Sequence, residues 1–101
     1  MPIYVSITKS TNPKKKYTAI FSHHVNDKLK KIKTTHFGAA GMSDFTIHKD
    51  KARRELYLKR HEKREDWNKY MTAGSLSRYI LWNKPTFNGS LRDFKKRFKL
   101  K

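Results

Sequence analysis

The stretch IYVSITKSTNPKKKYTAIFSH, residues 3–23, decides the fold. Its first eight residues alternate between apolar and polar side chains, the period of two that is typical of a half-buried strand. The pair Asn12-Pro13 then marks a turn, and residues 16–23 predict a second strand. The two strands predict an antiparallel hairpin with a loop of about five residues. The apolar face of the first strand carries Ile3, Val5 and Ile7.

Downstream of this hairpin, residues 27–37 predict a third strand, in which Ile32, Thr34 and His36 share one face. Residues 38–44, GAAGMSD, predict a loop whose two glycines permit positive φ or a close approach of a partner's backbone.

The first predicted helix covers residues 50–67, with Asp50 as its N-cap. Its apolar periodicity is weak, and Ala52, Leu56 and Tyr57 are the residues expected to face inward. Along the same helix, an i, i+4, i+7, i+11 spacing makes one stripe on the surface. This stripe consists of Arg53, Tyr57, Arg60 and Arg64.

Two more helices are predicted after it. Residues 72–84 form one, opened by Thr72 or Ser75 and closed before Pro85, because the residue preceding a proline resists helical geometry. Residues 90–101 form the other, in which Ser90 and Asp93 match a capping signature.

These elements predict one α+β domain over residues 1–101: an N-terminal β-hairpin or three-stranded antiparallel sheet followed by three short helices. Aliphatic residues are scarce, so the helices must supply the core from Leu76, Ile80, Phe94 and Phe98. Trp67 and Trp82 lie at predicted helix ends, where one side of each ring can stay wet while the other packs on the core.

Charge is the most informative feature of the composition. The chain has 25 Lys and Arg against 8 Asp and Glu, which leaves +17, and all seven arginines lie in the second half. Self-repulsion of this size destabilises a small fold unless a polyanion compensates for it. There is no cysteine, no apolar run of the roughly 18 residues that a membrane helix needs, and no signal-peptide pattern at the start. We therefore expect a non-secreted protein without a transmembrane segment that works in a reducing compartment.

Three basic segments predict non-enzymatic, sequence-independent binding of nucleic acid and do not by themselves distinguish DNA from RNA. They are the turn at residues 13–16, the helix around residues 51–64 and the helix around residues 92–99. The side chains expected to contact phosphates or bases are Arg53, Arg54, Arg60, Arg64, Lys95, Lys96, Arg97, Tyr57 and Trp67. Zinc-finger spacing, a leucine-zipper basic region and the aromatic RNA-recognition motif are all missing, so nothing indicates base-specific readout.

Two alternatives remain open at this point. A small structural protein that docks on acidic capsid or membrane-associated partners would use the aromatic region from Trp67 to Trp82 as its contact surface. A nuclease would use Asp44, His48 and His36, although their spacing matches no metal motif. We expect no metal, no cofactor and no catalytic residue. The G-x-x-G of residues 38–41 is more typical of a structural turn than of a backbone clamp.

The order of three stretches resembles a known group of proteins. THFGAAGMSDFTIHKDKARRELYLKRHEKREDW is followed by TAGSLSRYILWNKPT and SLRDFKKRF, and the likeness as a whole covers roughly Lys16 to Phe98. This pattern is similar to small basic proteins of nucleocytoplasmic large DNA viruses, of the chlorovirus and mimivirus type, found also in some algae. The resemblance implies viral DNA as the ligand and a place in the virion or in the cytoplasm or nucleus of the infected cell. It carries no catalytic or binding residues over to this chain.

Overall fold

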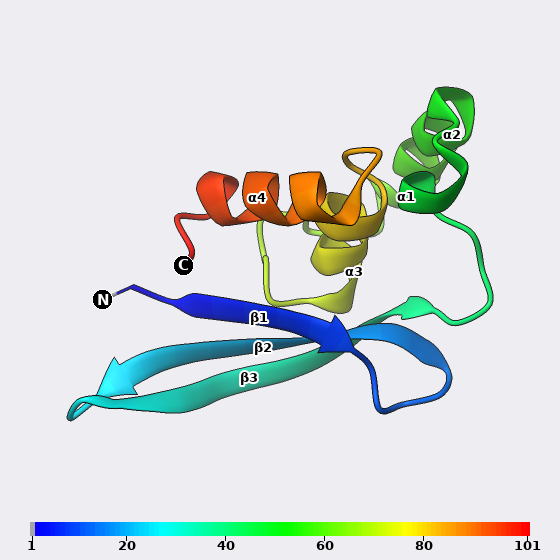
Figure 1. The fold of residues 1–101 in the computed structure, drawn as a ribbon. Coiled ribbons are helices and arrows are strands. Elements are labelled where there is room, and N and C mark those ends of the chain that lie inside the picture. Colours follow the sequence, from blue (N-terminus) through cyan, green and yellow to red (C-terminus); the bar gives the residue numbers. More distant parts are fainter. Residues whose placement is uncertain (1) are drawn as a thin grey trace.

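The computed structural model describes residues 2–101 and contains a three-stranded antiparallel sheet followed by short helices (Figure 1). This confirms the predicted α+β fold in its three-stranded form. The strands are β1 (Tyr4–Lys9), β2 (Lys15–Val25) and β3 (Lys28–Ala39). The helices are α1 (Phe45–His48), α2 (Lys51–His61), α3 (Ala73–Leu76), the π-helical turn η1 (Ser77–Leu81) and α4 (Phe87–Arg97).

Two hairpins build the sheet in the order β1-β2-β3. The first has the expected loop of about five residues, between Lys9 and Lys15. The second turns on only two residues, Asn26 and Asp27, with φ of 52° and 64°. Positive φ at both central positions is the requirement of a type I′ turn, and Asn and Asp tolerate that conformation better than most residues.

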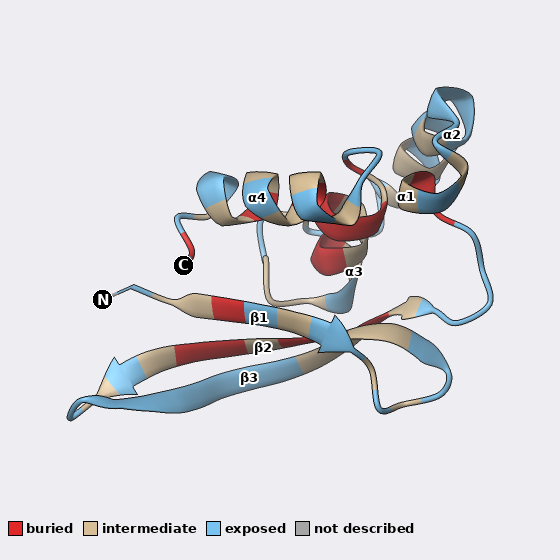
Figure 2. Ribbon diagram, in the orientation of Figure 1, coloured by how far each residue is buried: buried red, intermediate tan, exposed pale blue. Residues whose placement is uncertain are grey.

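Helices cover only one face of the sheet, and the other face is open (Figures 1 and 2). On the covered side, the side chains of Phe21, Phe37, Leu76, Ile80 and Phe94 are fully buried in one hydrophobic cluster. The predicted core is therefore confirmed for the residues of α3, η1 and α4, while Phe98 packs at its edge, half-buried.

The C-terminal residues lie beside β1, which the sequence pattern did not indicate. Leu100 and Ile3 form a parallel bridge, and the amide of Val5 donates to the carbonyl oxygen of Lys101 at 2.9 Å. Both ends of the described chain therefore lie at the same edge of the molecule (Figure 1).

The predicted helix of residues 50–67 is too long, because α2 ends at His61. The five residues that follow, EKRED, offer no apolar side chain that could hold another helical turn against the core. Asp50 is the N-cap as predicted, with its side chain accepting from the amides of Ala52 and Arg53. The expected inward face is wrong for Ala52 and Leu56, which are exposed, while Tyr57 is half-buried and stacks on Trp82. None of the residues of α2 is fully buried.

The second helical segment begins as predicted and ends earlier. Thr72 is the N-cap, and its hydroxyl accepts from the amide of Ser75 at 3.2 Å. The segment then widens into η1 and stops at Leu81, before Pro85 could act on it.

The cap predicted for the last helix is wrong. α4 begins three residues before Ser90, at Phe87, and Thr86 caps it by accepting from the amide of Gly89 at 3.1 Å. Ser90 is buried within the helix, and its hydroxyl accepts from the amide of Lys84 at 3.0 Å. Asp93 accepts a hydrogen bond from the side chain of Asn83.

Among residues 2–101, none of the helices has both the length and the apolar character that are needed to cross a bilayer.

Candidate nucleic-acid interface

A cleft of about 620 Å³ lies where α2 stands over the end of the sheet that carries the start of β2 and the end of β3. Lys15 and Lys16 reach it from β2, and Arg53 and Arg60 reach it from α2. The two lysines and the two arginines are separated by more than thirty residues in the chain, yet the fold brings them to one cleft. We call this site, with these four residues on its walls, the α2 cleft.

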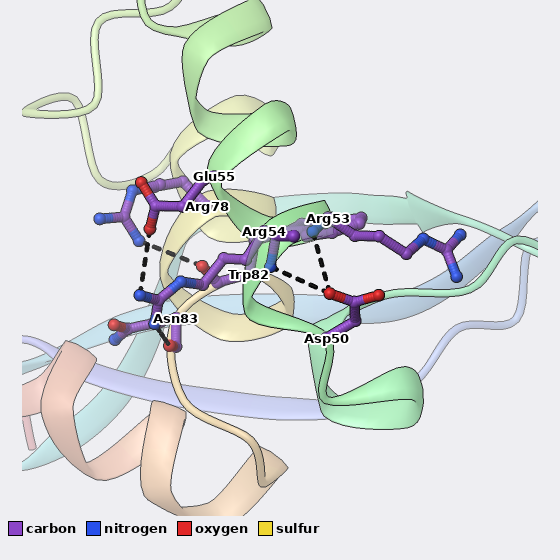
Figure 3. Close-up of polar contacts among 8 residues, drawn as sticks. Asp50, Arg53, Arg54, Glu55, Arg78, Trp82 and Asn83 are labelled. Atoms are coloured by element: carbon purple, nitrogen blue, oxygen red, sulfur yellow. Dashed lines mark hydrogen bonds and ion pairs between the residues drawn. The ribbon is translucent and has the colours of Figure 1, made fainter.

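The position of α2 depends on polar and cation–π contacts rather than on a buried apolar face. The guanidinium of Arg54 donates through Nη1 to the carbonyl oxygen of Asn83 at 3.0 Å and lies 5.0 Å from the ring centroid of Phe45 (Figure 3). Its Nη2 also pairs with the carboxylate of Glu55 at 3.2 Å. Arg54, which the sequence suggested as a phosphate contact, therefore holds α2 against the rest of the fold.

Arg53 extends away from the side of the helix on which Arg54 makes these contacts (Figure 3). Arg53 and Arg60 are both exposed and both line the α2 cleft. Within residues 2–101, neither guanidinium forms an ion pair with a carboxylate. Both groups are free to form bidentate hydrogen bonds to an anion such as phosphate.

Tyr57 stacks between neighbouring rings at the inner wall of the cleft. Its ring centroid lies 4.3 Å from that of Trp82, with the two planes only 3° apart, and 4.3 Å from that of His61. Stacked aromatic pairs of this kind add roughly 0.5–1.5 kcal/mol beyond the area they bury. Tyr57 therefore helps to hold α2 on η1 by stacking on Trp82. The sequence placed Trp82 at the edge of the core.

Burial, and after it the carboxylate of Glu65, raises the pKa of Tyr57 to about 12 from its ordinary 10.0. Because the folded state keeps this proton where the unfolded state loses it, Tyr57 lowers the free energy of unfolding as the pH rises from about 10 to about 12. We expect Tyr57→Phe to lose less stability than the wild type over that interval. Urea unfolding of both proteins at several alkaline pH values measures the difference, and parallel losses would contradict the raised pKa.

A buried ion pair borders the cleft. Lys16 donates to Oδ2 of Asp44, whose side chain is 3% exposed, and Oδ1 of Asp44 accepts from the amide of Thr46 at 2.9 Å. Asp44 thereby caps α1, a short helix that the sequence did not indicate. Since Asp44 neutralises Lys16, the free positive charge of the cleft comes from Lys15, Arg53 and Arg60.

Gly38 allows the backbone of β3 to pass close to η1 at the floor of the cleft. Its φ is +78°, and a Cβ there would lie 2.8 Å from Cδ1 of Leu81 and 3.2 Å from Cβ of Lys16. Gly38 and Gly41 have φ of 78° and 82°, so the expectation that the glycines of residues 38–44 adopt positive φ is confirmed.

The remaining predicted contact residues lie outside the cleft. Arg64 follows the end of α2 and does not line the cleft. Lys95, Lys96 and Arg97 form the last turn of α4, at the end of that helix that points away from α2 (Figure 1). Arg97 pairs with Asp93 at 3.6 Å. The structure therefore divides the predicted basic residues between two regions.

Trp67 and Arg78 form a cluster that the sequence did not indicate. The guanidinium of Arg78 lies 5.3 Å from the ring centroid of Trp67 and 5.0 Å from that of Tyr79, and it donates to the carbonyl oxygen of Trp82 (Figure 3). Burial lowers the pKa of Arg78. One face of the half-buried Trp67 therefore contacts an arginine of its own chain. The only signal in the sequence is that Arg78 lies next to the apolar residues Tyr79, Ile80 and Leu81.

The residues of the nuclease alternative have separate partners. The hydroxyl oxygens of Ser10 and Thr18 lie 2.9 Å and 2.7 Å from Nδ1 of His36. Nδ1 of His48 accepts from the amide of Asp50, and Asp44 is engaged by Lys16. Residues 2–101 contain no group of three or more His, Asp or Glu side chains placed to hold a metal ion.

Comparison with known proteins gives one match. Residues 5–61, more than half of the chain, match the model of a family described as "Family of unknown function (DUF5754)". The chain belongs to this family. The DUF5754 segment contains the sheet, α1 and α2, and with them Lys15, Arg53 and Arg60 of the α2 cleft. No curated protein and no solved structure matches the chain.

Proposed function

We propose that this DUF5754 protein binds nucleic acid without reading its sequence, and that the α2 cleft is the principal contact. The observation that carries the proposal is the convergence of Lys15, Arg53 and Arg60, from two distant segments, on one cleft in a chain of charge +17. Phosphate contacts of this kind give affinity and little sequence preference.

Basic residues outside the cleft extend this surface in the proposal. Lys95 and Lys96 in the last turn of α4 and Arg64 after α2 contribute long-range attraction, which is screened beyond about 8–10 Å at ordinary salt concentrations. Viral DNA is the ligand that the resemblance to proteins of large DNA viruses implies, and it is part of the proposal.

The test is a binding titration with duplex and single-stranded DNA at several salt concentrations. Three phosphate contacts predict a slope of log K against log salt of about −2.7, or roughly a hundredfold weaker binding at about 300 mM than at about 50 mM salt. Equal affinities at both salt concentrations would contradict phosphate contacts. Strong preference for one sequence at constant length would contradict sequence-independent binding.

Docking on an acidic protein surface, such as a capsid protein, is the second candidate. The observation that favours it is the outer side of α2, where Ala52, Leu56, Leu58 and Trp67 border a shallow hollow and no residue of the helix is buried. This function predicts that the protein is found in purified virus particles in a constant ratio to the shell protein. It also predicts that Leu58→Glu abolishes that incorporation while the salt-dependent binding of DNA is kept.

A further inference from the structure

The α2 cleft has an apolar wall that phosphate contacts leave unused. Leu56 is 53% exposed and Met42 is 64% exposed, and both line the cleft. Large apolar side chains exposed in a concave site are typical of surfaces that a ligand covers. A duplex would leave this wall exposed to solvent, because the faces of its bases are buried by stacking on neighbouring base pairs.

The size and charge of the cleft match a ligand that has both an apolar ring and an anionic group. A volume of about 620 Å³ is in the range of small-molecule sites, roughly 300–1,000 Å³. The apolar wall is inside the cleft, and the unpaired cations Lys15, Arg53 and Arg60 are on the same lining. A nucleotide has this combination, with a flat base and a phosphate only a sugar away.

The lining keeps a net positive charge, because its two carboxylates, Asp44 and Glu65, face the four cations Lys15, Lys16, Arg53 and Arg60. Asp44 is neutralised by Lys16. The carboxylate of Glu65 is directed at the first turn of α3, so close to Gly74 that a Cβ there would meet its Oε2 at 1.8 Å. An ionised carboxylate only accepts hydrogen bonds, so Glu65 can accept one from an exocyclic amino group or a ring N–H of a base.

We propose that the α2 cleft holds one unpaired nucleotide, with its base on the wall of Leu56 and Met42 and its phosphate at Arg53 and Arg60. This inference rests on the proposed nucleic-acid function and adds a preference for single strands over duplexes. The nucleotide belongs either to a single strand or to a free mononucleotide, since both present the same chemistry.

The experiment compares a mixed-sequence single-stranded oligonucleotide with the blunt duplex of the same length at one salt concentration. Covering the exposed parts of Leu56 and Met42 with a base predicts at least about fivefold tighter binding of the single strand. It also predicts a change in tryptophan fluorescence with the single strand alone, because Trp82 lines the cleft. A titration with deoxyadenosine monophosphate distinguishes the sources: an affinity equal to that of the strand assigns the site to free nucleotides, and a much weaker one assigns it to the strand.

Two exposed residues allow the wall to be altered without disturbing the core. Leu56→Gln and Met42→Gln should each reduce the preference for the single strand to near one while duplex affinity stays the same. Ile47→Gln is the matched control, because Ile47 is 61% exposed and does not line the cleft, and it should keep the preference. Thermal melting checks that all three variants are folded.

The proposal is overturned if the wild type binds single strand and duplex equally, or if Ile47→Gln removes the preference as fully as Leu56→Gln does. Equal, salt-dependent binding of both DNAs would leave the proposed nucleic-acid function in place. Failure to bind either DNA would overturn that function and this inference together.

Discussion

Replacing Phe94 by alanine should lower the free energy of unfolding by about 3–5 kcal/mol, the usual effect of removing a buried phenylalanine. Phe94 has no exposed surface, and its ring lies 5.3 Å from that of Phe98 and 6.3 Å from that of Tyr79. Its removal leaves a cavity between α4 and the sheet that the rigid aromatic neighbours cannot fill. Urea or guanidinium unfolding monitored by circular dichroism measures the change.

This loss is large for a domain of 101 residues, whose total stability is about 5–15 kcal/mol. Ile47→Ala provides the control, since Ile47 is mostly exposed, and should change the free energy of unfolding by no more than about 0.5 kcal/mol. A loss below about 1 kcal/mol for Phe94→Ala would show that α4 does not pack on the sheet as described.

The double variant Arg53→Gln/Arg60→Gln should bind DNA about a hundredfold more weakly at low salt, because each charge-assisted hydrogen bond to phosphate is worth roughly a factor of ten. The slope of log K against log salt should also become less steep by about two, one for each phosphate that the variant no longer neutralises. Both residues are exposed and unpaired within the described chain. The folded state should therefore be as stable as that of the wild type, and a salt series of titrations measures both effects.

Arg92→Gln/Lys96→Gln is the matched control for this variant. It removes the same charge from two exposed positions of α4, neither of which lines the cleft. We expect about a threefold loss of affinity from the lower overall charge, consistent with long-range electrostatics. If the control loses as much affinity as the cleft variant, binding depends on net charge and the α2 cleft has no special role.

The α2 helix shows which structural features local sequence patterns predict and which they do not. Asp50 as N-cap and the stripe of Arg53, Tyr57 and Arg60 follow from spacing alone, and the structure has both, but Arg64 lies beyond the end of α2. The inward face is wrong for Ala52 and Leu56, because α2 is attached through Arg54 and Tyr57 instead of through aliphatic burial. Periodicity reports which residues share a face, but it does not report whether a neighbouring element is there to cover that face.

The cap of α4 has a similar explanation. The sequence indicated Ser90 with Asp93 as the helix start, whereas the structure has Thr86 as the cap. The hydroxyl of Ser90 is occupied by the amide of Lys84 in the segment before the helix, so Thr86 is left to cap it. The choice depends on a contact between Ser90 and the segment before the helix, which the capping signature does not report.

The sequence by itself determined the antiparallel sheet, the three main helical segments, most of the core and the strongly basic character of the chain. These follow from alternation, capping residues and composition, which act within a few residues. Only the tertiary structure decided that the lysines of residues 15–16 line one cleft with the arginines of α2, that Arg54 is structural while Arg53 is free, and that the exposed Leu56 and Met42 line the same cleft. Each of these depends on the packing of segments far apart in the chain, and local sequence patterns do not specify which distant segments come into contact.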